Sequence, residues 1–407
     1  MIGALYIHIP FCASRCAYCD FATSACHDDA LMDSYADALS LQLRRAAKAG
    51  LLGNVKTIYI GGGTPTHLGA RRLNSLVYMI SLSVNLENVE EFTVEANPES
   101  LDAAIVKDLF ALGVNRMSIG VQSFDDAVLR EYGRPHAAAD VEAAIAAVKE
   151  RDMSFSLDLI CGGPNQTLAS WRFSVERAVV SGAGHVSIYP LAVEEGTPLA
   201  ARVEAGGWEG PSEDAEAEMM EVAEQILSSA GFERYEVASY ALPGCESKHN
   251  TAYWTGVEYL GLGAGASSMM TPATWEVCCA AGVFGNAATD DGAPCVETAP
   301  ADGRIRVATS ADTAAFCDSV GRPSAELEVM SRREAALEDA MLAFRRSAGL
   351  ALEKEAEFCC TVPELTAVLE KLQAEGLIAR MRDGSLVPTE RGWLMGNEIF
   401  GAIWDLA

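Results

Sequence analysis

Three cysteines stand close together near the start of the chain, in the stretch IPFCASRCAYCDF that covers residues 9–21. Cys12, Cys16 and Cys19 have the spacing C-x3-C-x2-C, and Phe21 stands where a fourth thiol could follow. A cubic iron–sulfur cluster is normally held by four thiolates, so a loop with three leaves one iron open to a small-molecule ligand. An open metal position is typical of sites that do chemistry. The loop therefore favours a reactive [4Fe–4S] cluster.

A structural zinc site is the alternative for this loop, with Cys26 or His27 as the fourth ligand, because the spacing alone does not exclude zinc. The first residues, MIGALYIHIPFC, lack the basic region, long apolar core and cleavage site of a secretory signal. We therefore expect a cytoplasmic protein, in which most of the 12 cysteines stay reduced and disulfides are disfavoured.

Short β-rich runs alternate with longer amphipathic stretches over the first 240 residues. This alternation predicts βαβ units and a parallel sheet. No G-x-G-x-x-G sequence follows the first run, which disfavours a dinucleotide-binding doubly wound fold. The predicted strands are 4–9, 56–60, 91–96, 115–121, 154–160 and 185–191, and predicted helices include 33–49, 101–112, 140–150 and 171–180.

Polar or glycine-rich residues follow each predicted strand at its carboxyl end. In β/α barrels this end of the strands carries the active site. The pattern therefore predicts one site built by consecutive strands. Its members are the cysteine loop, GGGTP at 61–65, Glu95 and Asn97, Gln122 and Ser123, Asp158, and Ala192.

The C-x3-C-x2-C loop, followed by a glycine-rich turn after the next strand, resembles the radical S-adenosylmethionine (SAM) superfamily. The resemblance implies a partial (β/α) barrel, with Cys12, Cys16 and Cys19 holding a [4Fe–4S] cluster. It also implies that the amino and carboxylate groups of SAM bind the fourth iron, and that one-electron reduction cleaves SAM to a 5′-deoxyadenosyl radical.

Further motifs narrow the resemblance to the branch that contains oxygen-independent coproporphyrinogen III oxidase and the HemW heme chaperones. The motifs run in order over nearly the whole chain and are weakest around 270–325. They are YIHIPFC, GGGTP, VEANPES, SIGVQSF, YGRPH and DLI followed by GGPNQT.

The resemblance implies SAM contacts for the first part of the site. Tyr6 stands where this branch has a SAM-binding tyrosine, and Tyr18 resembles the aromatic residue that packs on the adenine. Gly62, Gly63 and Thr64 resemble the turn that pairs with the SAM amino group. Glycine suits such a turn because a Cβ atom would prevent close approach of the backbone to a ligand.

The same resemblance assigns the remaining SAM contacts. Glu95 resembles the acid that pairs with the SAM ammonium, and Arg134 the arginine that holds its carboxylate. Charge-assisted pairs at both groups would orient the ligand. Gln122 and Asp158 resemble partners of the ribose, and Ala192 resembles a backbone contact.

Two departures separate the chain from the oxidase and favour the HemW group. The oxidase has a fourth cysteine where Phe21 stands here, and an extension before its first strand. The segment KHNTAYWTGVEYLGLGAGASS, residues 248–268, resembles a region of the HemW group. There we predict that His249 ligates heme iron. Ser267 departs from a histidine that is frequent in the group.

Aromatic side chains and glycines in the same segment suit a flat porphyrin. The alternative is that the segment only supplies a strand and a glycine turn that close the barrel. Residues 241–325 are accordingly expected to be a barrel-closing segment with an irregular insertion.

Residues 326–407 have two helical periods, at 333–344 and 362–374, and a hairpin pattern around Asp383 and Gly384. They predict a smaller α+β domain of winged-helix type, after a barrel over residues 1–240. Nine Lys or Arg face fifteen Asp or Glu in this span, which disfavours DNA binding. We expect a packing or lid domain.

The whole chain has a formal net charge of −27, which repels nucleic acid, and no apolar run long enough for an integral membrane protein. The prediction is a heme chaperone with a [4Fe–4S] cluster, SAM and heme as cofactors and an unidentified heme-acceptor protein as partner. A homodimer is left open, and so is whether SAM is cleaved. The alternatives are an oxygen-independent coproporphyrinogen III oxidase, a radical SAM methyltransferase, or a binding protein with structural zinc.

Overall fold

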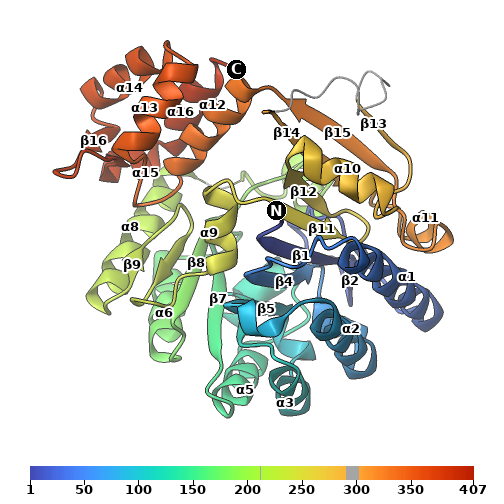
Figure 1. Ribbon diagram of the computed structural model, residues 1–407. Coiled ribbons are helices and arrows are strands. Elements are labelled where there is room, and N and C mark those ends of the chain that lie inside the picture. The colour runs from blue at the N-terminus through green and yellow to red at the C-terminus, as the bar shows by residue number, and fades with distance from the viewer. Residues whose placement is uncertain (211, 290–301) are drawn as a thin grey trace.

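The computed structural model describes residues 1–210, 212–289 and 302–407. Its centre is a curved, open sheet of 13 strands (Figure 1). Seven neighbouring strands run parallel, and their order is β11-β1-β4-β5-β6-β7-β8. They are β11 (Tyr259–Leu262), β1 (Ala4–Ile9), β4 (Thr57–Gly62), β5 (Glu91–Ala96), β6 (Arg116–Gln122), β7 (Ser154–Cys161) and β8 (His185–Pro190).

All six strands that the alternation predicted are present, with bounds that differ by at most two residues. Their side chains are buried almost without interruption, as is typical of parallel strands covered on both faces. The sheet is an open, partial barrel, which confirms the predicted fold class.

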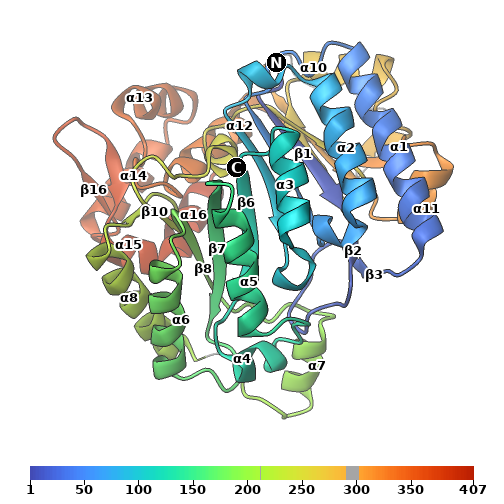
Figure 2. The ribbon, with the colours of Figure 1, turned by 90° about the horizontal axis from the view of Figure 1, so that it is seen from below.

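Helices cover one face of the sheet (Figures 1 and 2). The first is capped by Asp28, whose carboxylate accepts hydrogen bonds from the next turn, and it buries a stripe that contains Tyr35, Leu39 and Leu43. The other face of the sheet therefore stays available for polar side chains. The covering helices are α1 (Asp29–Lys48), α2 (Ala70–Ser83), α3 (Ala103–Ala111), α5 (Ala138–Lys149), α6 (Leu168–Val180) and α8 (Glu213–Ser229), and the short helices α4 (Asp126–Glu131) and α7 (Pro198–Glu204) follow β6 and β8.

The expectation that residues 241–325 close the barrel is wrong. The strand β11 pairs with β1 on the side away from β4, and β10 (Ser239–Ala241) and β9 (Glu233–Arg234) extend the opposite edge beyond β8. No pairing in the described residues joins the two edges. The strands extend the sheet at each edge because each edge strand has an unpaired side that a new strand can join.

The expected irregular insertion lies in part outside the described residues, at 290–301, and its described residues form regular elements. Mostly antiparallel strands continue the sheet, with a parallel pairing of β13 to β15. Ile305 and Val307 point into its core in alternation with polar neighbours. The elements are α9 (Lys248–Trp254), β12 (Ser267–Met270), α10 (Pro272–Ala280), β13 (Ala287–Thr289), β14 (Arg304–Thr309), α11 (Thr313–Asp318) and β15 (Ala325–Met330). These residues share one hydrophobic core with the first 240.

The C-terminal residues have a separate hydrophobic core. Three helices precede a two-stranded hairpin, in the order of a winged-helix domain, and two short helices follow (Figure 1). They are α12 (Arg332–Ala343), α13 (Leu352–Thr361), α14 (Leu365–Ala374), β16 (Ile378–Arg380), β17 (Leu386–Pro388), α15 (Glu390–Leu394) and α16 (Gly396–Trp404). Arg345, two residues after α12, places its guanidinium 5.2 Å from the centre of the ring of Trp254 in α9. None of the described helices combines the length and apolar character needed to span a membrane.

Tyr35 joins α1 to the ends of two central strands. Its hydroxyl donates to His8 O at 2.8 Å and accepts from Ala264 N at 3.0 Å, and its side chain is fully buried. We expect Tyr35→Phe to lower the free energy of unfolding by about 1–3 kcal/mol, because both backbone groups lose a buried partner. Thermal unfolding would measure the change.

Tyr78→Phe is the matched control, since Tyr78 is exposed on α2. Equal unfolding temperatures for the two variants would contradict this role of Tyr35.

Candidate functional site

The cysteine loop begins in β2 (Phe11–Cys12) and returns in β3 (Ser24–Ala25), which pair in parallel. Backbone hydrogen bonds fix the loop at two places. Cys26 N donates to Cys12 O at 3.0 Å and joins its two ends, and Ala17 N in its middle donates to Tyr132 O at 2.9 Å. The three thiols carry no disulfide. Thr64 Oγ1 donates to the Cys12 sulfur at 3.5 Å, and Arg134 Nη1 donates to the Cys16 sulfur at 3.3 Å.

A cavity of about 130 Å³, here called the cluster cavity, lies beside this loop. It brings together residues from the ends of five strands, as the pattern of polar strand ends predicted. Eleven of the residues predicted to bind the cluster or SAM line it. They are Cys12, Cys16, Tyr18, Cys19, Gly62, Gly63, Thr64, Glu95, Gln122, Arg134 and Asp158.

The glycine turn at the end of β4 packs directly against the cysteine loop. Gly63 N donates to Ile9 O at 2.7 Å and Thr64 N donates to Phe11 O at 2.8 Å. A Cβ atom on Gly63 would stand 2.6 Å from Phe11 O and 3.0 Å from the Cys12 sulfur. Any side chain there would push the loop away, so this position requires glycine for space.

Arg134 connects the loop to the neighbouring strands. Its Nη2 donates to Asn97 Oδ1 at 2.7 Å and to Gly120 O at 2.8 Å, which fixes the guanidinium at the edge of the cluster cavity. Its Nε is buried and has no partner. A buried donor without a partner indicates room for a ligand acceptor.

Two carboxyl groups complete the polar wall of the cavity. Glu95 accepts from Tyr59 OH at 2.6 Å and from Gly62 N at 2.9 Å. Burial raises the pKa of Glu95 to about 7, and burial also raises the pKa of Asp158, which accepts from Ser118 Oγ at 3.3 Å. The pKa of Glu95 is near neutral pH, so the charge of this carboxyl can change when a cation approaches.

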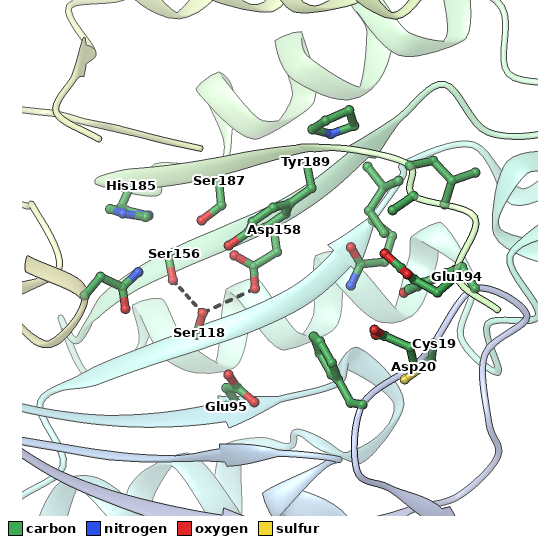
Figure 3. A pocket seen from close by; sticks show the side chains of 18 of the residues that line it. Cys19, Asp20, Glu95, Ser118, Ser156, Asp158, His185, Ser187, Tyr189 and Glu194 are labelled. Carbon is green, nitrogen blue, oxygen red and sulfur yellow. Dashed lines mark hydrogen bonds between the residues drawn. The ribbon is translucent and has the colours of Figure 1, made fainter. Parts of the chain in front are cut away.

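A second cavity of about 310 Å³, the inner cavity, adjoins the first on the concave face of the sheet (Figure 3). The two share Cys19, Glu95 and Asp158 among their lining residues. Ala192 lines the inner cavity and not the cluster cavity. In Figure 3, Cys19 lies at one end of the inner cavity and His185 at the other.

A third cavity of about 530 Å³, the aromatic cavity, shares Phe21 with the inner cavity and is lined by the predicted site residue Tyr6. The Tyr6 hydroxyl pairs with His8 Nδ1 at 2.9 Å. Glu95 and Phe21 line all three cavities, so the three spaces meet at these two side chains.

His249 lies in the interior at the start of α9 and lines none of the three cavities. Its Nδ1 pairs with Thr57 Oγ1 and its Nε2 with Tyr253 OH, both at 2.9 Å. Burial lowers the pKa of His249 to about 3, so the ring is neutral. Both nitrogens are engaged, and in this conformation neither is free to ligate an iron.

Sequence reasoning missed the polar stripe on the inner face of three adjacent strands. Its residues occupy alternate positions, so that the pleat places them all on the concave side. That alternation is visible in the sequence, but the near-continuous burial of parallel strands obscured it. The stripe consists of Arg116 and Ser118 on β6, Ser156 on β7, and His185, Ser187 and Tyr189 on β8.

The comparisons with known proteins agree with this architecture. A sequence family described as the radical SAM superfamily matches residues 6–178. The chain is 33% identical over 401 residues to the heme chaperone HemW of Lactococcus lactis, covering 98% of this chain and 96% of that protein. It is 34% identical over 402 residues to the heme chaperone HemW of Bacillus subtilis, covering 98% of each. The chain belongs to the HemW family of the radical SAM superfamily.

Among solved structures, coproporphyrinogen III oxidase (HemN) of Escherichia coli, a radical SAM enzyme, aligns with a TM-score of 0.77. The alignment covers 99% of this chain and 90% of that chain at 20% identity, which shows a shared fold.

Membership of the superfamily implies a [4Fe–4S] cluster and SAM. No three His, Cys, Asp or Glu side chains of the described residues gather around one point as ligands of a single metal ion would. A [4Fe–4S] cluster has no such requirement, because each thiolate binds a different iron. The free thiols of the loop, the cavity beside them and the orphaned Arg134 Nε fit the two groups.

We expect Cys12→Ala, Cys16→Ala and Cys19→Ala each to abolish binding of iron and sulfide after anaerobic reconstitution, because each removes one of three thiolates. Cys26→Ala is the matched control, since Cys26 lies next to the loop but outside the cluster cavity. Iron, sulfide and zinc analysis would measure the result. Loss of metal from the Cys26 variant, or zinc in place of iron, would support the structural zinc site instead.

We expect SAM binding to the cluster-loaded protein to weaken as the pH falls below about 7. The raised pKa of Glu95 means that its carboxyl is protonated below that pH and cannot pair with a cation, so affinity should fall up to about tenfold per pH unit. Calorimetry at several pH values would measure this dependence. Glu95→Gln should bind SAM weakly at every pH, whereas exposed Glu87→Gln should behave as the unaltered protein.

Proposed function

We propose that this protein is a heme chaperone that binds heme and transfers it to an acceptor protein, with the cluster and SAM controlling assembly or release. The observation that carries the proposal is the 33–34% identity, over 98% of this chain, to two heme chaperones. The shared fold with coproporphyrinogen III oxidase does not by itself separate the two functions.

Phe21 supports the chaperone over the oxidase. It occupies the position where the resemblance places a fourth cysteine of the oxidase, and a phenyl ring cannot ligate iron. Its side chain is 66% exposed and lines all three cavities. A large apolar ring that is exposed at a cavity edge is suited to contact a flat apolar ligand.

The aromatic cavity is the heme site that we propose. Its volume of about 530 Å³ lies within the usual range of small-molecule sites. Tyr253 and Tyr259 form an edge-to-face pair with ring centroids 4.7 Å apart, and Gly265 and Ser267 line another part. The flat aromatic surfaces suit a porphyrin. Arg306 borders the same cavity, where its guanidinium is paired with Glu328 and Glu338.

In this proposal His249 acts through Tyr253, whose hydroxyl it holds at 2.9 Å. Direct ligation of the heme iron by His249, as the sequence predicted, would require the ring to leave this hydrogen bond or that with Thr57.

The residues of the cluster cavity would hold the cluster and SAM in fixed positions. Bound together, the two groups supply one-electron chemistry. Cys12, Cys16 and Cys19 would bind three irons, the glycine turn would let the ligand approach the backbone, and Glu95 and Arg134 would orient its charged groups. We place the protein in the cytoplasm, because the loop thiols stay available only in a reducing compartment.

Anaerobic titration of the cluster-loaded protein with heme, followed in the Soret band, tests the proposal. We expect saturable binding of one heme per chain. Phe21→Ala should weaken it by about tenfold, because an exposed ring that contacts the porphyrin is removed. Phe110→Ala is the matched control, since that ring is 48% exposed on α3, away from the three cavities.

His249→Ala distinguishes the two roles of the histidine. A positioning role predicts weaker binding with an unchanged heme spectrum, whereas direct ligation predicts a changed spectrum. An absence of saturable heme binding would contradict the chaperone proposal. Coproporphyrinogen decarboxylation and methyl transfer would then be assayed.

A further inference from the structure

The inner cavity has one end that neither the cluster nor the SAM contacts explain. Arg116 and His185 are the first residues of β6 and β8, whereas the cluster cavity lies at the opposite, carboxyl ends of these strands. Figure 3 shows His185 at the end far from Cys19, with Ser156 and Ser187 between. This end is therefore distinct from the site described above.

Arg116 is a buried cation without a partner. Its side chain lines the cavity and the residue is 5% exposed. Its Nε is buried and unpaired. Its side chain forms no ion pair or hydrogen bond with any described residue, whereas many other charged groups of the structure are paired.

The carboxylates around Arg116 are engaged elsewhere. Glu91 accepts from Lys248 N at 2.8 Å and His249 N at 3.1 Å. Glu95 accepts from Tyr59 and Gly62, and Asp158 from Ser118. Asp158 interacts with Arg116 electrostatically, but no carboxylate of the described residues lies at ion-pair distance from the guanidinium. A buried guanidinium without a hydrogen-bonded anion is unfavourable, so this position can accept a negative partner.

His185 supplies a second unpaired group at the same end. It is 2% exposed, and its Nδ1 is buried without a partner. Its Nε2 pairs with Tyr235 OH at 2.8 Å, and the Tyr235 oxygen already accepts from Ser247 N at 3.2 Å. We assign the Tyr235 hydroxyl proton to the hydrogen bond with His185 Nε2, so the imidazole proton of His185 lies on Nδ1. Burial lowers the pKa of His185, so it acts as a neutral donor.

We propose that Arg116 and His185 bind the carboxylate group of a small molecule that enters the inner cavity. A guanidinium presents several donors in a plane that matches a carboxylate, and the histidine Nδ1 adds another. The single positive charge and the nearby Glu95 and Asp158 favour a monoanion over a phosphate dianion. The proposal does not require heme binding.

Two sources could supply this carboxylate. One is a propionate arm of heme, because the inner and aromatic cavities meet at Phe21 and Glu95. The other is a free small carboxylate. The chemistry that Arg116 and His185 recognise is the same in both cases.

The experiment uses the full, cluster-loaded chain and has two arms. In the first, thermal unfolding is followed with sodium propanoate, sodium phosphate or sodium chloride at equal ionic strength. A ligand that binds the folded state raises the unfolding temperature. In the second, heme is compared with heme dimethyl ester, which has no carboxylates. Arg116→Met and His185→Gln are run in both arms, with exposed Arg71→Met as the control.

A rise in the unfolding temperature with propanoate alone, absent from both variants, would establish a free carboxylate as ligand. An affinity for heme about tenfold above that for the ester, with the ratio reduced towards one in both variants, would establish a propionate arm. If Arg116→Met does not fold, the result with His185→Gln decides whether the carboxylate site exists.

The proposal is overturned if neither the rise in unfolding temperature with propanoate nor the preference for heme over its ester is seen. It is also overturned if phosphate and chloride raise the unfolding temperature as much as propanoate does, or if either effect persists in the variants. If no heme binds at all, the chaperone function fails, and the propanoate arm still decides whether the carboxylate site exists.

Discussion

The site depends on the close contact between the glycine turn after β4 and the cysteine loop after β1. Gly63 and Thr64 donate to backbone oxygens of Ile9 and Phe11, and there is no room for a Cβ atom on Gly63. Since β1 and β4 are paired up to Ile9 and Gly62, two adjacent strands hold this contact rigidly. The thiols therefore face the polar ends of the following strands, and the cluster cavity forms between them.

The curved sheet allows polar chemistry in a buried place. Helices cover its convex face with apolar stripes, so the concave face can carry hydroxyl, carboxyl and guanidinium groups (Figures 1 and 2). Most of these groups satisfy one another, as Ser118 and Ser156 do at 2.9 Å. The unpaired nitrogens of Arg134, Arg116 and His185 are the exceptions, and all three border cavities. On the concave face, these three unpaired nitrogens therefore lie where ligands would bind.

Phe21 and Glu95 relate the three cavities to one another. Both side chains border the cluster, inner and aromatic cavities, so a ligand in one space lies beside residues of the other two. This arrangement offers a physical route by which SAM could influence a heme in the aromatic cavity. Because the pKa of Glu95 is raised to about 7, the charge of this carboxyl can change when a ligand binds in one of the three cavities.

The sequence alone determined the cysteine loop, the six parallel strands and most of the residues that line the cluster cavity, because spacing, alternation and strand ends are local properties. It did not determine that residues 241–325 would extend the sheet beyond β1, since pairing between strands far apart in the chain depends on the exposed edges. Nor could it show that Thr57 and Tyr253 occupy both nitrogens of His249, or that Arg116 has no anion. Hydrogen-bond partners come from elements distant in sequence, so only the tertiary structure decided them.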